Sequence, residues 1–95
     1  MQWKPYDPGW LVALARESRP DEPWLAEALS KCTRAAQESP AYIHFVDPTH
    51  PNEPGSEWRF AENVVLHHPG EGELVLDVLE GARIGGVELL KRLRS

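Results

Sequence analysis

The side chains best suited to chemistry in this chain are carboxylates, and they gather in its middle. Residues 38–80 hold nine acidic residues and a single basic one, Arg59, whereas the whole 95-residue chain has a net charge of −5. A strongly negative surface repels nucleic acid and anionic membranes and speeds association with a basic protein surface. The charge pattern therefore predicts a basic protein partner, and neither nucleic acid nor a membrane. An acidic face that only keeps a small domain soluble is the alternative.

The segment from Asp47 to Glu57 combines acidic residues with three prolines, Pro48, Pro51 and Pro54. A connection of this length between neighbouring strands is uncommon unless it has a function, and proline lowers the entropy lost when a partner holds a loop. The segment is therefore predicted to be a binding loop; an exposed connector or a cover over a sheet edge is the alternative. With the acidic residues that follow it, the predicted partner-binding set is Asp47, His50, Glu53, Glu57, Glu62, Glu71 and Glu73.

Four histidines with acidic neighbours raise a second hypothesis, a small metal-dependent enzyme. His44 and His67 could approach each other across strands with Glu62 as a third ligand, but the adjacent His67 and His68 must point to opposite faces of a strand. The chain has no HExxH or CxxC motif that would fix a metal site, no G-x-S-x-G nucleophile motif and no glycine-rich phosphate loop. We therefore predict no catalytic residue, no metal site and no cofactor.

Cys32 is the only cysteine, so the chain cannot form an intramolecular disulfide. Its position on an apolar helix stripe predicts a small core residue rather than a nucleophile. Residues 1–20 contain no apolar stretch of the length that a signal peptide has, and no run of 18 apolar residues occurs. We expect a soluble cytoplasmic protein.

Proline after an acidic residue predicts where two helices begin. Asp7-Pro8-Gly9 precedes a helix that runs to Ser18, and Asp21-Glu22-Pro23 precedes a second helix. The apolar residues of the second segment recur every three or four positions: Trp24, Leu25, Ala28, Leu29, Cys32, Ala35 and Ala36. The pattern predicts a helical hairpin whose second helix reaches Ala36.

The later part of the chain has the patterns of strands. Residues 41–46 are rich in β-branched and aromatic side chains, and residues 57–68 alternate between apolar and polar. A turn at 69–72 then leads into a returning strand at 73–79, with Leu74, Leu76 and Val78 facing the core. Gly81 breaks this strand pattern, and Gly85 and Gly86 lie before the last amphipathic segment. The spacing of residues 87–94 predicts a short terminal helix.

Glu62 is the one carboxylate whose predicted position is unusual. It falls on an otherwise apolar face of the long strand, with Trp58, Phe60, Val64 and Leu66. Three roles fit this position: a buried ion pair with Arg59 or Arg83, a place where the sheet emerges from its cover, or a catalytic acid.

These elements predict an α+β fold of one domain, residues 1–95, with an N-terminal helical hairpin, a three-stranded antiparallel sheet and a short C-terminal helix. In size, acidity and domain plan the chain is similar to small accessory proteins that inhibit or neutralise a partner, including immunity proteins and antitoxins. This resemblance of class implies a non-enzymatic acidic binding protein, which is our leading hypothesis. The alternatives are the metal-dependent enzyme and a homo-oligomer, such as a homodimer, in which an exposed strand edge pairs with its symmetry mate.

Overall fold

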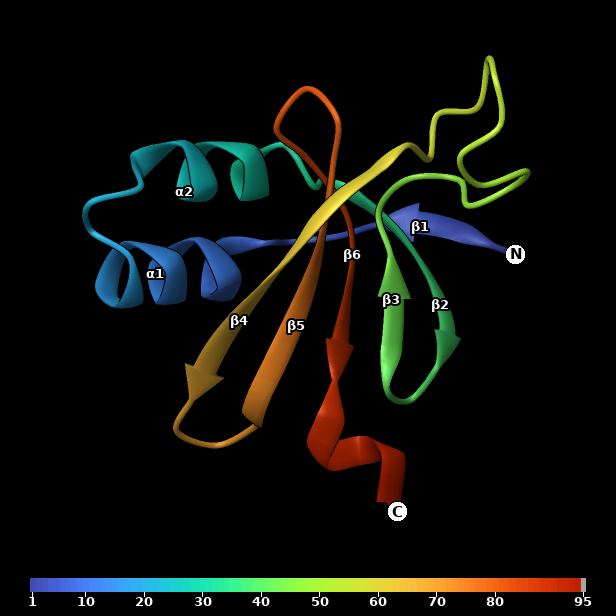
Figure 1. The fold of residues 1–95 in the computed structure, drawn as a ribbon. Coiled ribbons are helices and arrows are strands. Elements are labelled where there is room, and N and C mark those ends of the chain that lie inside the picture. Colours follow the sequence, from blue (N-terminus) through green and yellow to red (C-terminus); the bar gives the residue numbers. More distant parts are fainter. Residues whose placement is uncertain (95) are drawn as a thin grey trace.

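Two short helices follow a three-residue strand in the computed structural model, which describes residues 1–94 (Figure 1). Strand β1 spans Trp3–Pro5, and helices α1 and α2 span Gly9–Ser18 and Pro23–Ser30. Asp7 Oδ1 accepts a 2.9 Å hydrogen bond from the backbone N–H of Gly9, and Pro23 lies in the first turn of α2, where its missing N–H costs no hydrogen bond. Both predicted helix starts are confirmed. No helix within residues 1–94 has the length and apolar composition that a membrane span needs.

Six strands form one antiparallel sheet in the order β1-β2-β3-β6-β5-β4. The strands after the helices are β2 (Arg34–Ser39), β3 (Tyr42–His44), β4 (Phe60–His68), β5 (Gly72–Leu79) and β6 (Arg83–Leu89). Strand β6 lies between β3 and β5, and a 3₁₀ helix, η1 (Leu90–Arg94), follows it. Figure 1 shows β4 and β5 as a long hairpin on one side of β6, with β2 and β3 on the other.

The predicted three-stranded sheet with a C-terminal helix is wrong. Ala35 and Ala36 continue the helical spacing of the residues before them, yet α2 ends at Ser30 and both alanines lie in β2, paired with β1. The segment predicted as a terminal helix is divided, because its first three residues, Val87–Leu89, belong to β6. Short strands such as β1 and β2 gain their stability from pairing with distant segments, which local sequence preference does not record.

The helices and one face of the sheet enclose the core. Buried side chains of α1 and α2 contact those side chains of β4, β5 and β6 that alternate onto this face, including the predicted Leu74, Leu76 and Val78. Other buried members of this core are Leu11, Leu25, Leu29, Leu66 and Leu89. Neither α1 nor α2 covers the second face, which is named the open face below.

A β-bulge between Phe60 and Glu62 changes which side chains of β4 share a face. Phe60 pairs with Leu79 and therefore lies on the open face, whereas Glu62 lies on the helix-covered side with Val64. Trp58, before the bulge, also lies on the open face, where it packs on β6. The prediction of one common face for these residues is wrong, because the extra residue in the bulge shifts the alternation.

Two glycines in β6 make room on the open face. A Cβ on Gly85 would lie 2.8 Å from Cζ3 of Trp58, and a Cβ on Gly86 would lie 2.7 Å from the carbonyl oxygen of Ile43. Glycine is the residue that lets a side chain or a neighbouring backbone approach this closely. Gly85 and Gly86, which the sequence pattern puts at a junction between a strand and a helix, therefore lie inside a central strand.

Candidate functional site

The segment 47–57, named the acidic loop, is braced by its own hydrogen bonds. Asn52 ties it to the start of β4 twice: its backbone N–H donates to the carbonyl of Trp58 at 2.7 Å, and its Oδ1 accepts from the backbone N–H of Phe60 at 2.9 Å. The hydroxyl of Ser56 donates to the carbonyl of Thr49 at 2.9 Å and closes the loop across its middle. The loop therefore has a defined shape although most of its side chains are exposed.

Four of the seven predicted partner-binding residues lie together in this loop. Asp47, His50, Glu53 and Glu57 line one hollow of about 350 Å³. Hydrogen bonds from the hydroxyl and the backbone N–H of Thr49 lower the pKa of Asp47. Nδ1 of His50 lies 3.2 Å from Oε2 of Glu53, and Glu57 has no ion-pair partner among the side chains that the structure describes. The loop thus presents carboxylates that a partner can pair with.

The structure does not bring the other three predicted residues, Glu62, Glu71 and Glu73, together with the loop. Figure 1 shows the β4–β5 turn, which contains Glu71, and the acidic loop at opposite ends of β4. Oε2 of Glu71 lies 2.6 Å from Nη2 of Arg92, and this hydrogen bond lowers the pKa of Glu71. Glu73 begins β5 next to that turn. Glu62 is exposed on the helix-covered side, and Arg59 pairs with Glu80 rather than with Glu62.

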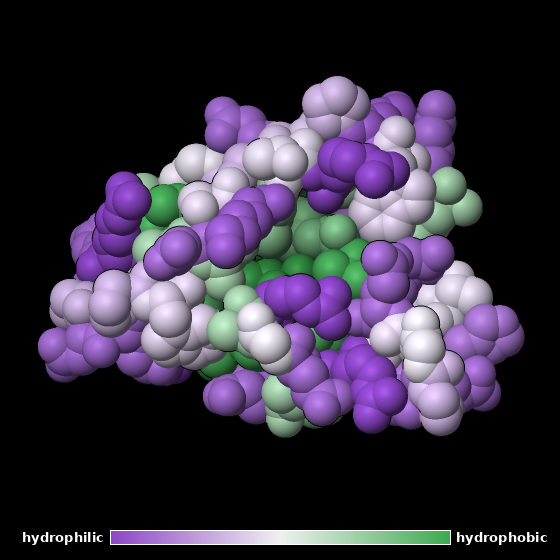
Figure 2. Space-filling model, turned by 90° about the horizontal axis from the view of Figure 1, so that it is seen from above, coloured by the Kyte–Doolittle hydropathy of each residue, from purple (hydrophilic) through white to green (hydrophobic). Residues whose placement is uncertain are grey.

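Two further hollows adjoin the acidic loop and extend it across this end of the molecule. The first, of about 280 Å³, shares Asp47 and Glu57 with the loop hollow. The second, of about 230 Å³, shares Phe45, Val46 and Arg83 with the first and lies between the end of α2 and the β5–β6 turn. Figure 2, which views this end from above, shows apolar side chains deep between polar ones. The three hollows together are named the end groove, which is acidic at the loop and apolar at α2.

Cys32 lines the apolar hollow and also belongs to the core. Its thiol lies 3.7 Å from the carbonyl oxygen of Ala28, to which it donates, and burial raises its pKa to about 12. The thiol is therefore protonated and weakly nucleophilic at neutral pH. The prediction that Cys32 is a core residue is confirmed.

A second group of polar side chains lies on the open face and is missing from the predicted set. The hydroxyl of Tyr42 donates to Asp77, whose other carboxylate oxygen accepts a 2.9 Å hydrogen bond from Asn63. The Tyr42 ring stacks on His44 with ring centroids 4.5 Å apart, and Nε2 of His44 lies 3.1 Å from Oε1 of Glu38. The alternation of β3 and β5, which places these side chains opposite the core residues, is the signal that could have found them.

The charged side chains that act on Tyr42 in the open-face group are all negative. Burial, the hydrogen bond to Asp77 and the negative charges of Asp77, Glu88 and Glu38 raise the pKa of Tyr42 far above its usual range. His44 is only 4% exposed, and its Nδ1 has no hydrogen-bond partner among the described residues. A carboxylate accepts hydrogen bonds, so Nε2 of His44 is the donor to Glu38. The group is a braced polar network within the sheet.

The structure separates the residues of the alternative metal site. His44 lies on the open face of β3, His67 near the far end of β4, and Glu62 on the helix-covered side. Within residues 1–94, no group of three or more His, Cys, Asp or Glu side chains is arranged to hold a metal ion. The three side chains therefore cannot act on one ion in this arrangement.

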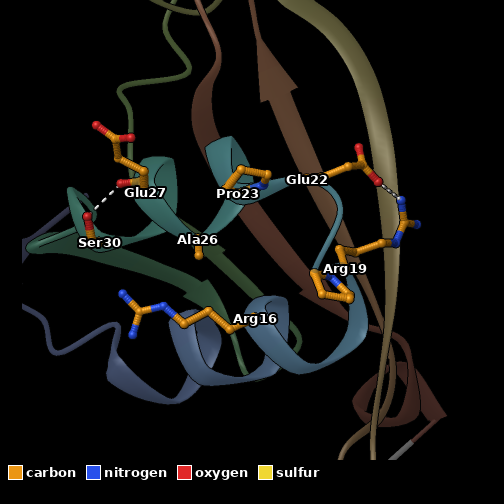
Figure 3. Close-up of a pocket in the computed structure, with 8 residues that line it drawn as sticks. Arg16, Arg19, Glu22, Pro23, Ala26, Glu27 and Ser30 are labelled. Atoms are coloured by element: carbon orange, nitrogen blue, oxygen red, sulfur yellow. Dashed lines mark hydrogen bonds and ion pairs between the residues drawn. The ribbon is translucent and has the colours of Figure 1, made fainter.

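A hollow of about 490 Å³ lies between α1 and α2 (Figure 3). It is lined by two cations, Arg16 and Arg19, and two anions, Glu22 and Glu27. Nη1 of Arg19 lies 2.8 Å from Oε1 of Glu22, and Figure 3 shows the Arg16 side chain along the space between the helices. The opposing charges balance, so this hollow favours neither an anion nor a cation.

Comparisons of the chain with protein-family models, with curated proteins and with solved structures found no match.

Proposed function

We propose that the protein is a non-enzymatic binding protein whose acidic loop holds a basic segment of a partner protein. The observation that carries this proposal is the bracing of the loop: Asn52 and Ser56 hold its backbone while the carboxylates of Asp47, Glu53 and Glu57 stay exposed. A loop that is already held in one conformation loses little entropy on binding. Less of the interaction free energy is therefore offset by ordering the loop.

Charge supports a basic partner over an acidic one. The loop hollow is lined by three carboxylates and one histidine, His50, which already contacts Glu53. Exposed carboxylates of this kind raise the association rate with a basic surface, and the effect declines with salt because the Debye length is about 8 Å at physiological ionic strength. A role as an inhibitor, immunity or antitoxin-like accessory protein fits this mode of binding. The single buried thiol of Cys32 suits a reducing compartment such as the cytoplasm.

Two features of β4 oppose the alternative in which this edge strand pairs with a second copy. Nη2 of Arg19 donates to the carbonyl of Val65 at 3.1 Å and so covers a backbone acceptor of the strand. The bulge between Phe60 and Glu62 interrupts its regular pairing pattern. Bulges and charged side chains at an edge are features that protect it from pairing with another chain.

Selection from a displayed library of random twelve-residue peptides tests the proposal without a known partner. We expect the protein to enrich peptides rich in lysine and arginine. The double substitution Glu53→Lys, Glu57→Lys reverses charge in the loop and removes the contact of Glu53 with His50. It keeps the hydrogen bonds of Asn52 and Ser56 that brace the loop, because none of them uses the side chain of Glu53 or Glu57. The matched control, Glu17→Lys with Glu27→Lys, makes the same change in charge at two exposed helix residues, of which Glu27 lines the hollow between α1 and α2.

Affinities of the selected peptides are measured by fluorescence anisotropy at low and at physiological salt. The loop variant should bind at least tenfold more weakly, which corresponds to about 1.4 kcal/mol, and the helix variant should stay within twofold of the original protein. Binding to the original protein should weaken with salt. A selection that enriches no basic peptides, or an equal loss in both variants, would contradict the proposal.

A further inference from the structure

The apolar end of the end groove is a pocket of the size of one side chain. Its volume of about 230 Å³ is below the roughly 300–1,000 Å³ of sites that enclose drug-sized ligands. Its apolar lining comes from the end of α2, the residues after β3 and the start of β6: Ala28, Cys32, Phe45, Val46 and Ile84. A single aliphatic side chain that enters this pocket leaves water for an apolar surrounding, which is favourable.

Two cations lie at the rim of this pocket, Lys31 after α2 and Arg83 at the start of β6. Nη2 of Arg83 donates to the carbonyl of Glu57 at 2.7 Å, and Nε donates to the carbonyl of Glu80 at 3.2 Å. These bonds use two of the five N–H donors of a guanidinium. Neither Lys31 nor Arg83 pairs with a carboxylate among the side chains that the structure describes. The rim can therefore hold an anionic group.

Charge changes sign along the end groove. Arg83 lines both the apolar pocket and the neighbouring hollow, which is of mixed charge because Arg34, Asp47 and Glu57 line it too. The loop hollow beyond it has three carboxylates and no lysine or arginine. The groove is thus complementary to a segment with a negative charge and an apolar side chain at one end and positive charges at the other. At the carboxyl terminus of a protein, even an apolar residue carries a negative charge, that of its α-carboxylate. Binding of a C-terminal carboxylate is a recurring mode of peptide recognition.

We propose that the end groove binds the carboxyl-terminal segment of the partner. The last residue inserts an apolar side chain into the pocket, its carboxylate meets Lys31 and Arg83, and the lysines or arginines before it meet the acidic loop. This inference rests on the proposed function and gives the bound segment a direction. Continuity of the pocket with the acidic loop favours a peptide over a small carboxylic acid, because a small acid would leave the loop unused.

The probe is a fluorescein-labelled peptide with four basic residues, a serine and a terminal leucine that has a free carboxylate. Two matched peptides end in leucine amide and in serine with a free carboxylate. We expect each of these changes to weaken binding about tenfold, since one removes the charge-assisted hydrogen bonds at the rim and the other removes the apolar contact. The protein variant Lys31→Glu should weaken the free-acid peptide about tenfold and leave the amide within twofold. Lys4→Glu, on an exposed lysine of β1, is the matched control and should change neither.

The outcomes separate this inference from the proposed function. Equal affinity for the free acid and the amide would overturn the inference. The proposed function is tested separately, by the effect of charge reversal in the acidic loop on peptide binding. Acetyl-leucine that binds as tightly as the labelled peptide would also overturn it, because the pocket would then be a site for small carboxylates. A preference for the free acid that is lost in Lys31→Glu and kept in Lys4→Glu would support it.

Discussion

The substitution Gly85→Ala tests whether the Trp58 indole lies on the backbone of β6. A Cβ at this position would come within 2.8 Å of Cζ3 and 2.9 Å of Cη2 of Trp58, and within 3.0 Å of Cδ2 of Leu79. Trp58 is 8% exposed and Leu79 is fully buried, so neither side chain can move without disturbing its neighbours. The added methyl group must therefore displace the indole, the strand or both.

Two effects of opposite sign determine the magnitude. Alanine in place of glycine inside a strand stabilises the folded chain by about 0.5–1 kcal/mol, because the unfolded chain then has less conformational freedom to lose. Overpacking a filled site destabilises by about 1–3 kcal/mol. The steric effect is larger, so we expect a net loss of about 1–2 kcal/mol, which lowers Tm by roughly 5–15 °C in a domain of this size.

The second variant, Trp58→Phe, removes the two indole carbons that the new methyl group would meet. In this background only the 3.0 Å approach to Cδ2 of Leu79 remains, so Gly85→Ala should destabilise much less than in the original protein. The two substitutions should therefore be coupled rather than additive. Urea unfolding followed by far-ultraviolet circular dichroism measures all four proteins. Additive effects, or a Gly85→Ala variant that is more stable than the original protein, would refute the placement of the indole.

Three further predictions concern ionisable groups. Burial raises the pKa values of Tyr6 and Tyr42, so ultraviolet absorbance should show less tyrosine ionisation near pH 10 in the folded than in the unfolded protein. Stability should fall as the pH rises above 10, where the tyrosines of the unfolded chain ionise, and equal ionisation in both states would contradict the burial. Cys32, whose pKa burial raises to about 12, should react slowly with a thiol reagent at neutral pH and much faster in urea; a fast native reaction would contradict its burial. Arg92 lowers the pKa of Glu71, so this carboxylate contributes stability at neutral pH that is lost as the pH falls through its lowered pKa. Glu71→Gln should reduce that acid dependence in unfolding curves, and an unchanged dependence would argue against the pair.

The helix starts were predictable because their signals are local. Asp7 supplies an acceptor for the free backbone N–H of Gly9. Pro23 lies in the first turn of α2, where backbone N–H groups have no partner within the helix. The end of α2 was not predictable in the same way. Ala35 and Ala36 fit the helical spacing, and only the strands on either side of β2 show that they belong to the sheet.

The central position of β6 could not be inferred from its own residues. Gly85 and Gly86 fit a junction between a strand and a helix, because glycine inside a strand usually weakens it. Their real role depends on Trp58 and on the carbonyl of Ile43, which are distant in sequence and close in space. The apolar residues at 87, 89, 90 and 93 also fit a helix. The chain is a strand up to Leu89 because it pairs with β3 and β5.

The sequence predicted part of the candidate site because that part is contiguous. Asp47, His50, Glu53 and Glu57 lie in one braced loop, and their proximity follows from their spacing. The apolar pocket next to them could not be predicted, because it combines the end of α2, the residues after β3 and the β5–β6 turn. The sequence pattern put Trp58 and Phe60 on the face of Glu62 and Val64 because a bulge, which adds one residue, has no clear signature in the alternation pattern.

The strand order also has a consequence for the chain while it is being synthesised. Strands β1, β2 and β3 form one hydrogen-bonded group, β4 and β5 form another, and β6, the last of the six to leave the ribosome, joins the two. Until then, Ile43 and Leu76 lack Val87, which pairs with both of them. The nascent chain therefore carries two strand edges that have no neighbour, and such edges are the sites at which chaperones or other nascent chains can bind before the sheet closes.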